Sequence, residues 1–190
     1  ALPQIFHTAD LILVISPESK EAMLKMGARE DQCYLFPGGV DEELYKDYEK
    51  VEFEQFRKKH GIPENKKIIS YLGTIEERKN PLAVVRAARK LLDLHEVHFV
   101  IAGRISDQEK RVGDEAQKLK NMSYVGEISD EEKVQLIKGS YLNILMSRME
   151  ALGLTQLEFM YGGVPVMTSA VGGQRWLVRD KIDGIHVNGP

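Results

Sequence analysis

The stretch that decides the fold covers residues 146–169 and reads M-S-R-M-E-A-L-G-L-T-Q-L-E-F-M-Y-G-G-V-P-V-M-T-S. It predicts the end of a buried strand, a tight turn at Gly153, a short helix starting near Leu154, a Gly-Gly stop and a second strand over 164–168. Two glutamates, Glu150 and Glu158, lie eight positions apart across the turn. Few other residues in the chain suggest a catalytic or binding role.

The same alternation of strand and helix extends in both directions from this stretch. Apolar runs predict further strands over 9–16, 33–36, 67–73, 97–102, 123–125, 141–146 and 184–187. Helix-starting and amphipathic patterns predict helices over 17–26, 51–60, 81–93, 106–120, 129–138 and 174–179. Residues 42–49 are polar and are expected to be irregular, in the manner of a linker. Short connections between alternating elements predict the α/β class, with a parallel sheet covered by helices on both faces.

Composition limits the classes of function. The chain has 190 residues, of which 43% are hydrophobic and 29% charged, as in a soluble globular protein. The net charge of −3 gives no general case for binding nucleic acid. A single cysteine, Cys33, excludes an intrachain disulfide and is expected to be a buried thiol in a reducing compartment. The apolar run 11–15 is too short to span a bilayer, no signal peptide is apparent, and we expect a piece of a longer protein.

Ligands of parallel sheets bind at the carboxyl ends of the strands. Four predicted strands end at Gly73-Thr74, Gly103-Arg104, Val125-Gly126 and Ser147-Arg148. In the focal stretch, a helix start at a strand end forms an anion site from free backbone N–H groups. Those N–H groups belong to Leu152, Gly153, Leu154 and Thr155.

The two glutamates suit a different part of a ligand, because ionised carboxylates accept hydrogen bonds from sugar and ribose hydroxyls. One anion site beside two hydroxyl acceptors would suit a nucleotide sugar. The simpler alternative has one glutamate stabilising the helix dipole and Glu158 in solvent. The spacing taken alone favours this simpler alternative.

The loop 73–80 offers a second candidate site. Arg78 and Lys79 follow a strand end, where they could neutralise a diphosphate, although a solvated loop is the better explanation of this segment taken alone. The chain has no Walker A loop and no G-x-G-x-x-G motif. Its histidines lack metal-ligand spacing, and no pattern indicates a nucleophilic triad.

Taken together and in order, these pieces resemble the retaining glycosyltransferases of family 4, also called group 1 glycosyltransferases. The resemblance rests on A-D-L-I-L-V-I-S, P-G-G-V-D, Y-L-G-T-I-E-E-R-K-N, V-I-A-G, M-S-Y-V-G-E-I-S and S-R-M-E-A-L-G-L-T-Q-L-E-F-M-Y-G-G-V-P-V. It implies the GT-B fold, which has two Rossmann-like domains around a cleft. Residues 1–45 would be the last strand-helix unit of the first domain plus the linker, and 46–190 the nucleotide-sugar-binding domain without its closing helices.

The resemblance also implies roles for particular residues. Glu150 and Glu158 form the family's E-x7-E motif, in which Glu150 contacts the donor hexose and Glu158 the ribose. Lys79 would neutralise the departing diphosphate, which the backbone of 152–154 holds. The remaining expected donor-binding residues are Gly73, Thr74, Arg78, Gly103, Val125, Gly126, Ile128 and Thr155. The expected reaction is hexosyl transfer from a nucleotide-diphosphate sugar with retention of configuration, without a cofactor or bound metal.

Departures from the family pattern keep alternatives open. Thr74 stands where the family commonly has Arg, and Arg78 is one candidate to supply the missing charge. Ala151 replaces a usual Gly, and Gly38 a usual Asn. A non-catalytic homologue that only binds nucleotide sugar is one alternative, and an epimerase on the same fold fits less well. The expected partners are a sugar donor, the missing N-terminal domain, and a glycan, lipid-linked or small-molecule acceptor. A cytoplasmic location is expected, with peripheral contact at the inner membrane face coming from the missing half.

Overall fold

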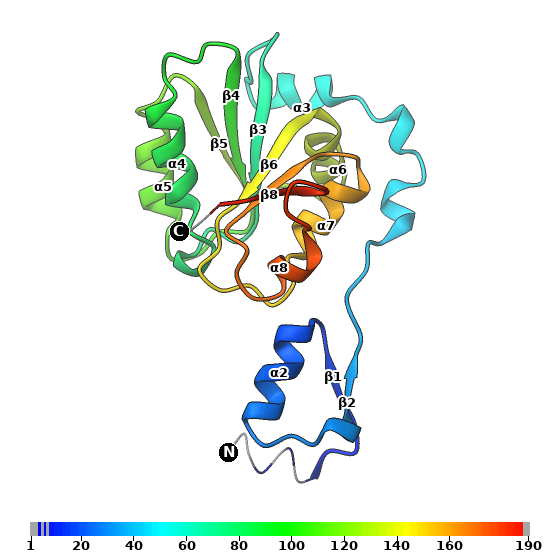
Figure 1. The fold of residues 1–190 in the computed structure, drawn as a ribbon. Helices are drawn as coiled ribbons and strands as arrows, with labels where there is room; N and C mark the ends of the chain where they lie inside the picture. Colours follow the sequence, from blue (N-terminus) through cyan, green and yellow to red (C-terminus); the bar gives the residue numbers. More distant parts are fainter. Residues whose placement is uncertain (1–3, 5, 7, 188–190) are drawn as a thin grey trace.

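The computed structural model describes residues 4, 6 and 8–187, and its main feature is a six-stranded sheet in which every pair of neighbours is parallel (Figure 1). The strand order is β5-β4-β3-β6-β7-β8. The strands are β3 (Lys67–Leu72), β4 (Val97–Ala102), β5 (Met122–Gly126), β6 (Ser140–Leu145), β7 (Val166–Thr168) and β8 (Gly184–His186). This arrangement confirms the predicted α/β class.

Helices cover both faces of this sheet (Figure 1). They are α3 (Phe53–Lys59), α4 (Pro81–Lys90), α5 (Glu109–Ala116), α6 (Asp130–Gly139), α7 (Leu154–Tyr161) and α8 (Gln174–Leu177). The predicted capping box of α6 is present, because Ser129 Oγ accepts from the Glu132 N–H at 3.2 Å and the Glu132 carboxylate accepts from the Ser129 N–H at 3.2 Å. Two predicted helices are shorter than expected: α4 ends at Lys90, and α5 begins only at Glu109.

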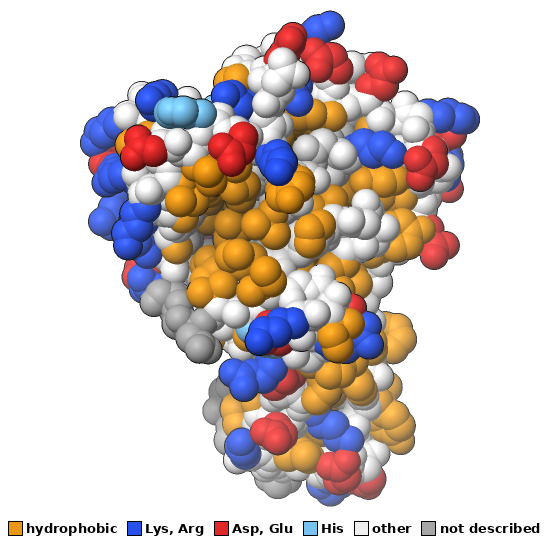
Figure 2. All heavy atoms as spheres, turned by 45° about the horizontal axis from the view of Figure 1, so that its top comes forward, with side chains coloured by type: hydrophobic (Ala, Val, Ile, Leu, Met, Phe, Trp, Pro, Cys, Tyr) orange, Lys and Arg blue, Asp and Glu red, His pale blue; other side chains and the backbone are white. Residues whose placement is uncertain are grey.

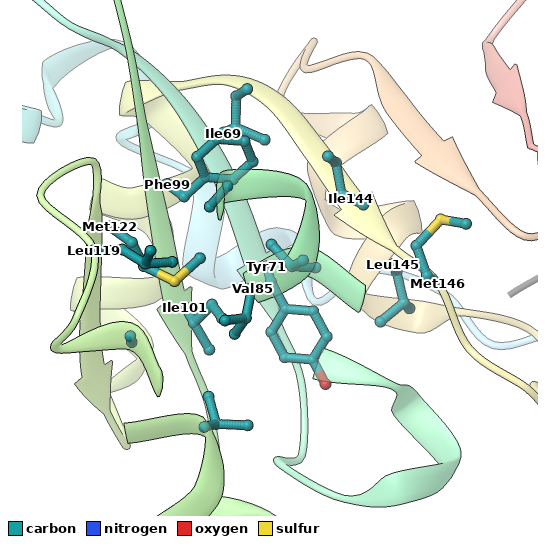
Figure 3. Packing of buried hydrophobic residues seen from close by; sticks show 14 of the residues in the cluster. Ile69, Tyr71, Val85, Phe99, Ile101, Leu119, Met122, Ile144, Leu145 and Met146 are labelled. Carbon is teal, nitrogen blue, oxygen red and sulfur yellow. The ribbon is translucent and has the colours of Figure 1, made fainter. Parts of the chain in front are cut away.

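Each face of the sheet has its own hydrophobic core. The core under α4 and α5 is shown in Figure 3, where Tyr71, Val85, Phe99 and Ile101 pack together. The second core lies under α3, α6 and α7 and includes the fully buried Phe159. Burial on both faces explains why β3 and β4 are continuous apolar runs rather than alternating ones.

A small separate unit precedes the main sheet. It contains β1 (Ile12–Val14) paired in parallel with β2 (Cys33–Leu35), and α2 (Pro17–Lys25), whose predicted cap Ser16 accepts from the Ser19 N–H at 3.1 Å. Cys33 is buried, as predicted.

The prediction of a buried strand over 9–16 is wrong in two respects. Only Ile12–Val14 form a strand, and Leu11 and Leu13 are 54% and 55% exposed. The physical reason is that only one side of this two-stranded sheet is covered by α2 (Figure 1). Hydrophobic side chains therefore reach the surface of the small unit (Figure 2).

The segment predicted to be irregular, 42–49, is instead partly helical. It forms the 3-10 turns η2 (Glu42–Tyr45) and η3 (Tyr48–Lys50). Tyr45 is only 4% exposed and its ring packs edge-on against Tyr161 of α7, with centroids 5.3 Å apart. The Tyr48 hydroxyl donates to the Gly162 carbonyl at 3.0 Å. The prediction failed because the buried Tyr45 and the half-buried Tyr48 anchor an otherwise polar segment to the end of α7.

Candidate functional site

The strand order creates a crevice between the carboxyl ends of β3 and β6. From β3 the chain proceeds outward to β4 and β5, then returns to the other side of β3 to form β6. The loops that leave β3 and β6 therefore diverge to opposite faces, which is where open α/β sheets bind ligands. These are the loops that the sequence analysis selected.

The two loops are fastened to each other. The Arg148 N–H donates to the Arg78 carbonyl at 2.8 Å, and the Arg78 guanidinium donates to the Met149 carbonyl at 3.1 Å. Arg148 also forms an ion pair with Glu77 at 2.8 Å. Glu77 and Arg78 of one loop thus lie along the loop that carries Glu150.

Lys79 and Glu150, predicted from separate strand ends, form an ion pair. Their side chains are 16% and 8% exposed, and the Ser147 hydroxyl donates to the same carboxylate at 3.2 Å. Burial strengthens such a pair and makes either charge costly if its partner is removed. The pair places one cation and one hydroxyl acceptor side by side at the end of β6.

Glu158 lies one turn into α7 and pairs with Lys133 of α6 at 2.7 Å. It is 19% exposed, which contradicts the simpler alternative of a solvated glutamate. Burial works against the ammonium of Lys133, but the hydrogen bond and charge of Glu158, with Asp130 at 3.3 Å, raise the pKa of Lys133 above its ordinary value. Glu158 is therefore held in position by a permanently charged partner.

A pocket of about 340 Å³ opens over the ends of β3 and β4 and the start of α6 and α7. Its lining combines predicted site residues with several that the sequence analysis did not select. The predicted ones are Gly73, Thr74, Lys79, Gly103, Ile128, Thr155 and Glu158. The others are Leu72, Arg104, Glu127, Ser129, Asp130 and Lys133.

Close backbone contacts shape the floor of this pocket. Gly103 has φ +139°, and a Cβ there would lie 1.9 Å from the Gly73 carbonyl oxygen, so only glycine fits. Behind them the buried Tyr71 donates its hydroxyl to the Thr74 carbonyl at 2.8 Å, and Figure 3 shows its ring extending from the core toward this loop. Burial, with the charges of Glu76 and Glu150, raises the pKa of Tyr71, so the hydroxyl stays a donor.

The turn before α7 also has the predicted character. Gly153 is left-handed, with φ +99°. The loop 172–173 lies against the Glu150 and Ala151 carbonyls: a Cβ at Gly172 or Gly173 would lie 2.1 or 2.0 Å from them. Gly38 has a local reason too, because a Cβ there would lie 2.5 Å from a methyl carbon of Leu154.

Several predicted residues lie outside the pocket lining. Glu150, predicted to contact the donor sugar, is outside the lining too: it is 8% exposed and pairs with the lining residue Lys79. Gly153 also lies outside it; Leu152 is 2% exposed, Leu154 is 49% exposed, and Val125 and Gly126 end β5. Arg78 is held by Glu76 at 2.5 Å and by the Met149 carbonyl. Two lining cations were missed: Lys133 gave no sequence signal, whereas Arg104 follows a strand-end glycine just as Thr74 does.

The crevice and its charged pairs define an α/β protein with a candidate ligand site at the switch point of a parallel sheet. The chain belongs to the family described as glycosyl transferases group 1, which residues 52–190 match. This confirms the resemblance seen in the sequence. No helix in the described part of the chain is both long and apolar enough to cross a membrane.

Individual relatives agree with this family. The D-inositol 3-phosphate glycosyltransferase of Mycobacterium tuberculosis is 27% identical over 98% of this chain and 39% of its own length. A glycosyltransferase of Methanocaldococcus jannaschii is 28% identical over 70% of this chain and 34% of its own. Among solved structures, HepE of Anabaena in complex with UDP-glucose covers 99% of this chain and 53% of that one, with a TM-score of 0.81 and 20% identity. The chain thus spans under two-fifths of these curated relatives and about half of the solved structure.

Proposed function

We propose that the pocket binds the nucleotide-diphosphate sugar donor of a retaining glycosyltransferase that transfers a hexosyl group to an acceptor. The observation that carries the proposal is that Lys79 and Glu158 line one pocket at the switch point, with Glu150 paired to Lys79. The names of two relatives point the same way, since one is a glycosyltransferase and another was solved with UDP-glucose. The acceptor, the remaining half and the whole reaction belong to the same proposal.

The geometry suggests which residue contacts each part of the donor. Glu158 lines the pocket as an acceptor for ribose hydroxyls, and Glu150 lies next to Lys79 as an acceptor for hexose hydroxyls. Lys79 neutralises negative charge that develops on the leaving diphosphate, which is the main electrostatic demand of this transfer. The N–H groups at the start of α7 supply further donors to the phosphates. No step in this scheme uses a metal.

The test is calorimetric titration of the protein with UDP, GDP and ADP. A nucleotide diphosphate that binds would support the donor site, and no binding by any of the three at millimolar concentration would refute it. Glu158→Gln should weaken binding of that nucleotide about 10- to 100-fold, because hydrogen bonds to a charged acceptor contribute about 1.5–3 kcal/mol. Pyrophosphate binding should be unchanged or tighter, because Lys133 loses its partner. Glu131→Gln, an exposed change on α6, is the matched control.

A second candidate is a homologue that binds nucleotide sugar without transferring it. The observation favouring it is Thr74, a neutral residue that lines the pocket where the family commonly has arginine. A full-length protein that binds a donor but neither transfers nor hydrolyses its sugar would select this candidate. Turnover with any acceptor would exclude it.

A further inference from the structure

Three cationic side chains line the pocket, and two of them are already neutralised. Lys79 is paired with Glu150, and Lys133 with Glu158. The third, Arg104, forms no ion pair and no side-chain hydrogen bond within residues 8–187. Among the described residues, Arg104 is therefore the lining cation that no carboxylate already neutralises.

The backbone places Arg104 beside the neutral Thr74. The Arg104 carbonyl accepts from the Ile75 N–H at 2.9 Å, so the loops that leave β3 and β4 lie side by side here. One residue earlier, the close approach of Gly103 to Gly73 fixes the spacing of the two strand ends. Both Thr74 and Arg104 line the same pocket.

Arg78, the other residue considered as a substitute for the missing charge, is occupied elsewhere. Its guanidinium is bound by the Glu76 carboxylate at 2.5 Å and donates to the Met149 carbonyl at 3.1 Å. It does not line the pocket. Its role in the structure is to fasten the two loops together.

Charge balance makes the identity of the free cation important. The pocket lining carries three acidic side chains against its three cations; the acids are Glu127, Asp130 and Glu158. Without Arg104 the lining would be net negative and would repel a diphosphate. Arginine also forms two parallel hydrogen bonds to phosphate oxygens, which threonine cannot.

We propose that Arg104, from the end of β4, binds the diphosphate of the donor and takes the place of the arginine that Thr74 replaces at the end of β3. This inference rests on the proposed function, since it concerns the same pocket. The proposal moves the phosphate contact from the end of β3 to the end of β4, so the site keeps its positive charge although Thr74 is neutral.

The test compares affinity for a nucleoside diphosphate with affinity for its nucleoside. In Arg104→Gln, affinity for UDP (or GDP or ADP, whichever the unchanged protein binds best) should fall about 10-fold or more, while the corresponding nucleoside binds as before. Arg104→Lys should recover part of the loss. The dependence of affinity on salt should also become shallower in Arg104→Gln, because one phosphate contact is gone. Arg111→Gln, an exposed arginine on α5 outside this pocket, should change nothing.

The outcomes separate the two proposals. If the unchanged protein binds a nucleoside diphosphate but Arg104→Gln binds it equally well, the assignment to Arg104 is overturned and the donor site stands. If Arg78→Gln loses the diphosphate preference and Arg104→Gln keeps it, the charge comes from Arg78 instead. If the unchanged protein binds none of the three diphosphates, the proposed function fails first and this inference with it.

Discussion

Replacing Gly103 by alanine should be far more damaging than its size suggests. The new Cβ would lie 1.9 Å from the Gly73 carbonyl oxygen, whereas real Cβ atoms keep at least 3.0 Å. The ends of β3 and β4 would have to separate by about 1 Å, which breaks the bonds from Gly73 N–H to Ala102 O and from Ile75 N–H to Arg104 O. Two lost bonds cost about 1 kcal/mol each, and the backbone at φ +139° adds about 1–2 kcal/mol for a side-chain residue. The expected loss of stability is about 3–4 kcal/mol.

Gly126→Ala is the matched control. Gly126 also ends a strand of this sheet and has φ +73°, but a Cβ there meets no atom within 4 Å. It should cost only the backbone strain, about 1–2 kcal/mol. Urea unfolding followed by far-ultraviolet circular dichroism gives both values, provided that the slope with urea stays constant. Equal destabilisation by the two variants would refute the argument that strand contact, rather than backbone conformation, requires glycine at 103.

Three further predictions concern charge and capping. Burial, with the charges of Lys66 and Arg57, lowers the pKa of His98 to about 4, so the imidazole takes up a proton in the unfolded chain first as pH falls below 6.5. Between pH 7 and pH 5 the free energy of unfolding should therefore drop by about 2 kcal/mol more in the wild type than in His98→Gln. Equal drops in the two proteins would disprove this. Ser129→Ala should cost about 1 kcal/mol in urea unfolding through loss of the α6 cap, whereas Ser106→Ala, at no helix cap, should be neutral. Lys79→Met and Glu150→Gln should each lower the free energy of unfolding by about 3 kcal/mol or more, and the double variant should lower it by less than the sum of the two. Strictly additive losses would contradict a buried ion pair.

The architecture could be predicted because local signals agreed with one another. Continuous apolar runs in β3 and β4, the cap at Ser129 and the glycine stops all indicated alternating parallel strands and helices. The buried Tyr45 could not be predicted in the same way, because it lies in a polar segment whose partner, Tyr161, is more than a hundred residues away. Tertiary contact decided that segment, and local composition did not reveal it.

The site shows the same division. Glu150 and Lys79 could be placed at strand ends from sequence, and the strand order then brought them together. The partner of Glu158 could not be found, because Lys133 lies on another helix and the capping box beside it indicates only a helix start. Arg104 was within reach of sequence reasoning, since it has the same position after its strand glycine as Thr74. The difference between Arg104 and Arg78 depends on which guanidinium is occupied by neighbouring groups.

The fastening of the 77–80 loop to the 147–150 loop has a consequence for exchanging parts between family members. Each loop presents its partner with a specific carbonyl, carboxylate or guanidinium, from Glu77 to Arg148 and from Arg78 to Met149. A transplanted loop would arrive without the matching Glu77–Arg148 and Arg78–Met149 contacts and would shift the Lys79–Glu150 pair that they position. The two loops should therefore be grafted as one cassette, and attempts to alter donor preference by exchanging either loop alone should yield proteins that lose binding altogether.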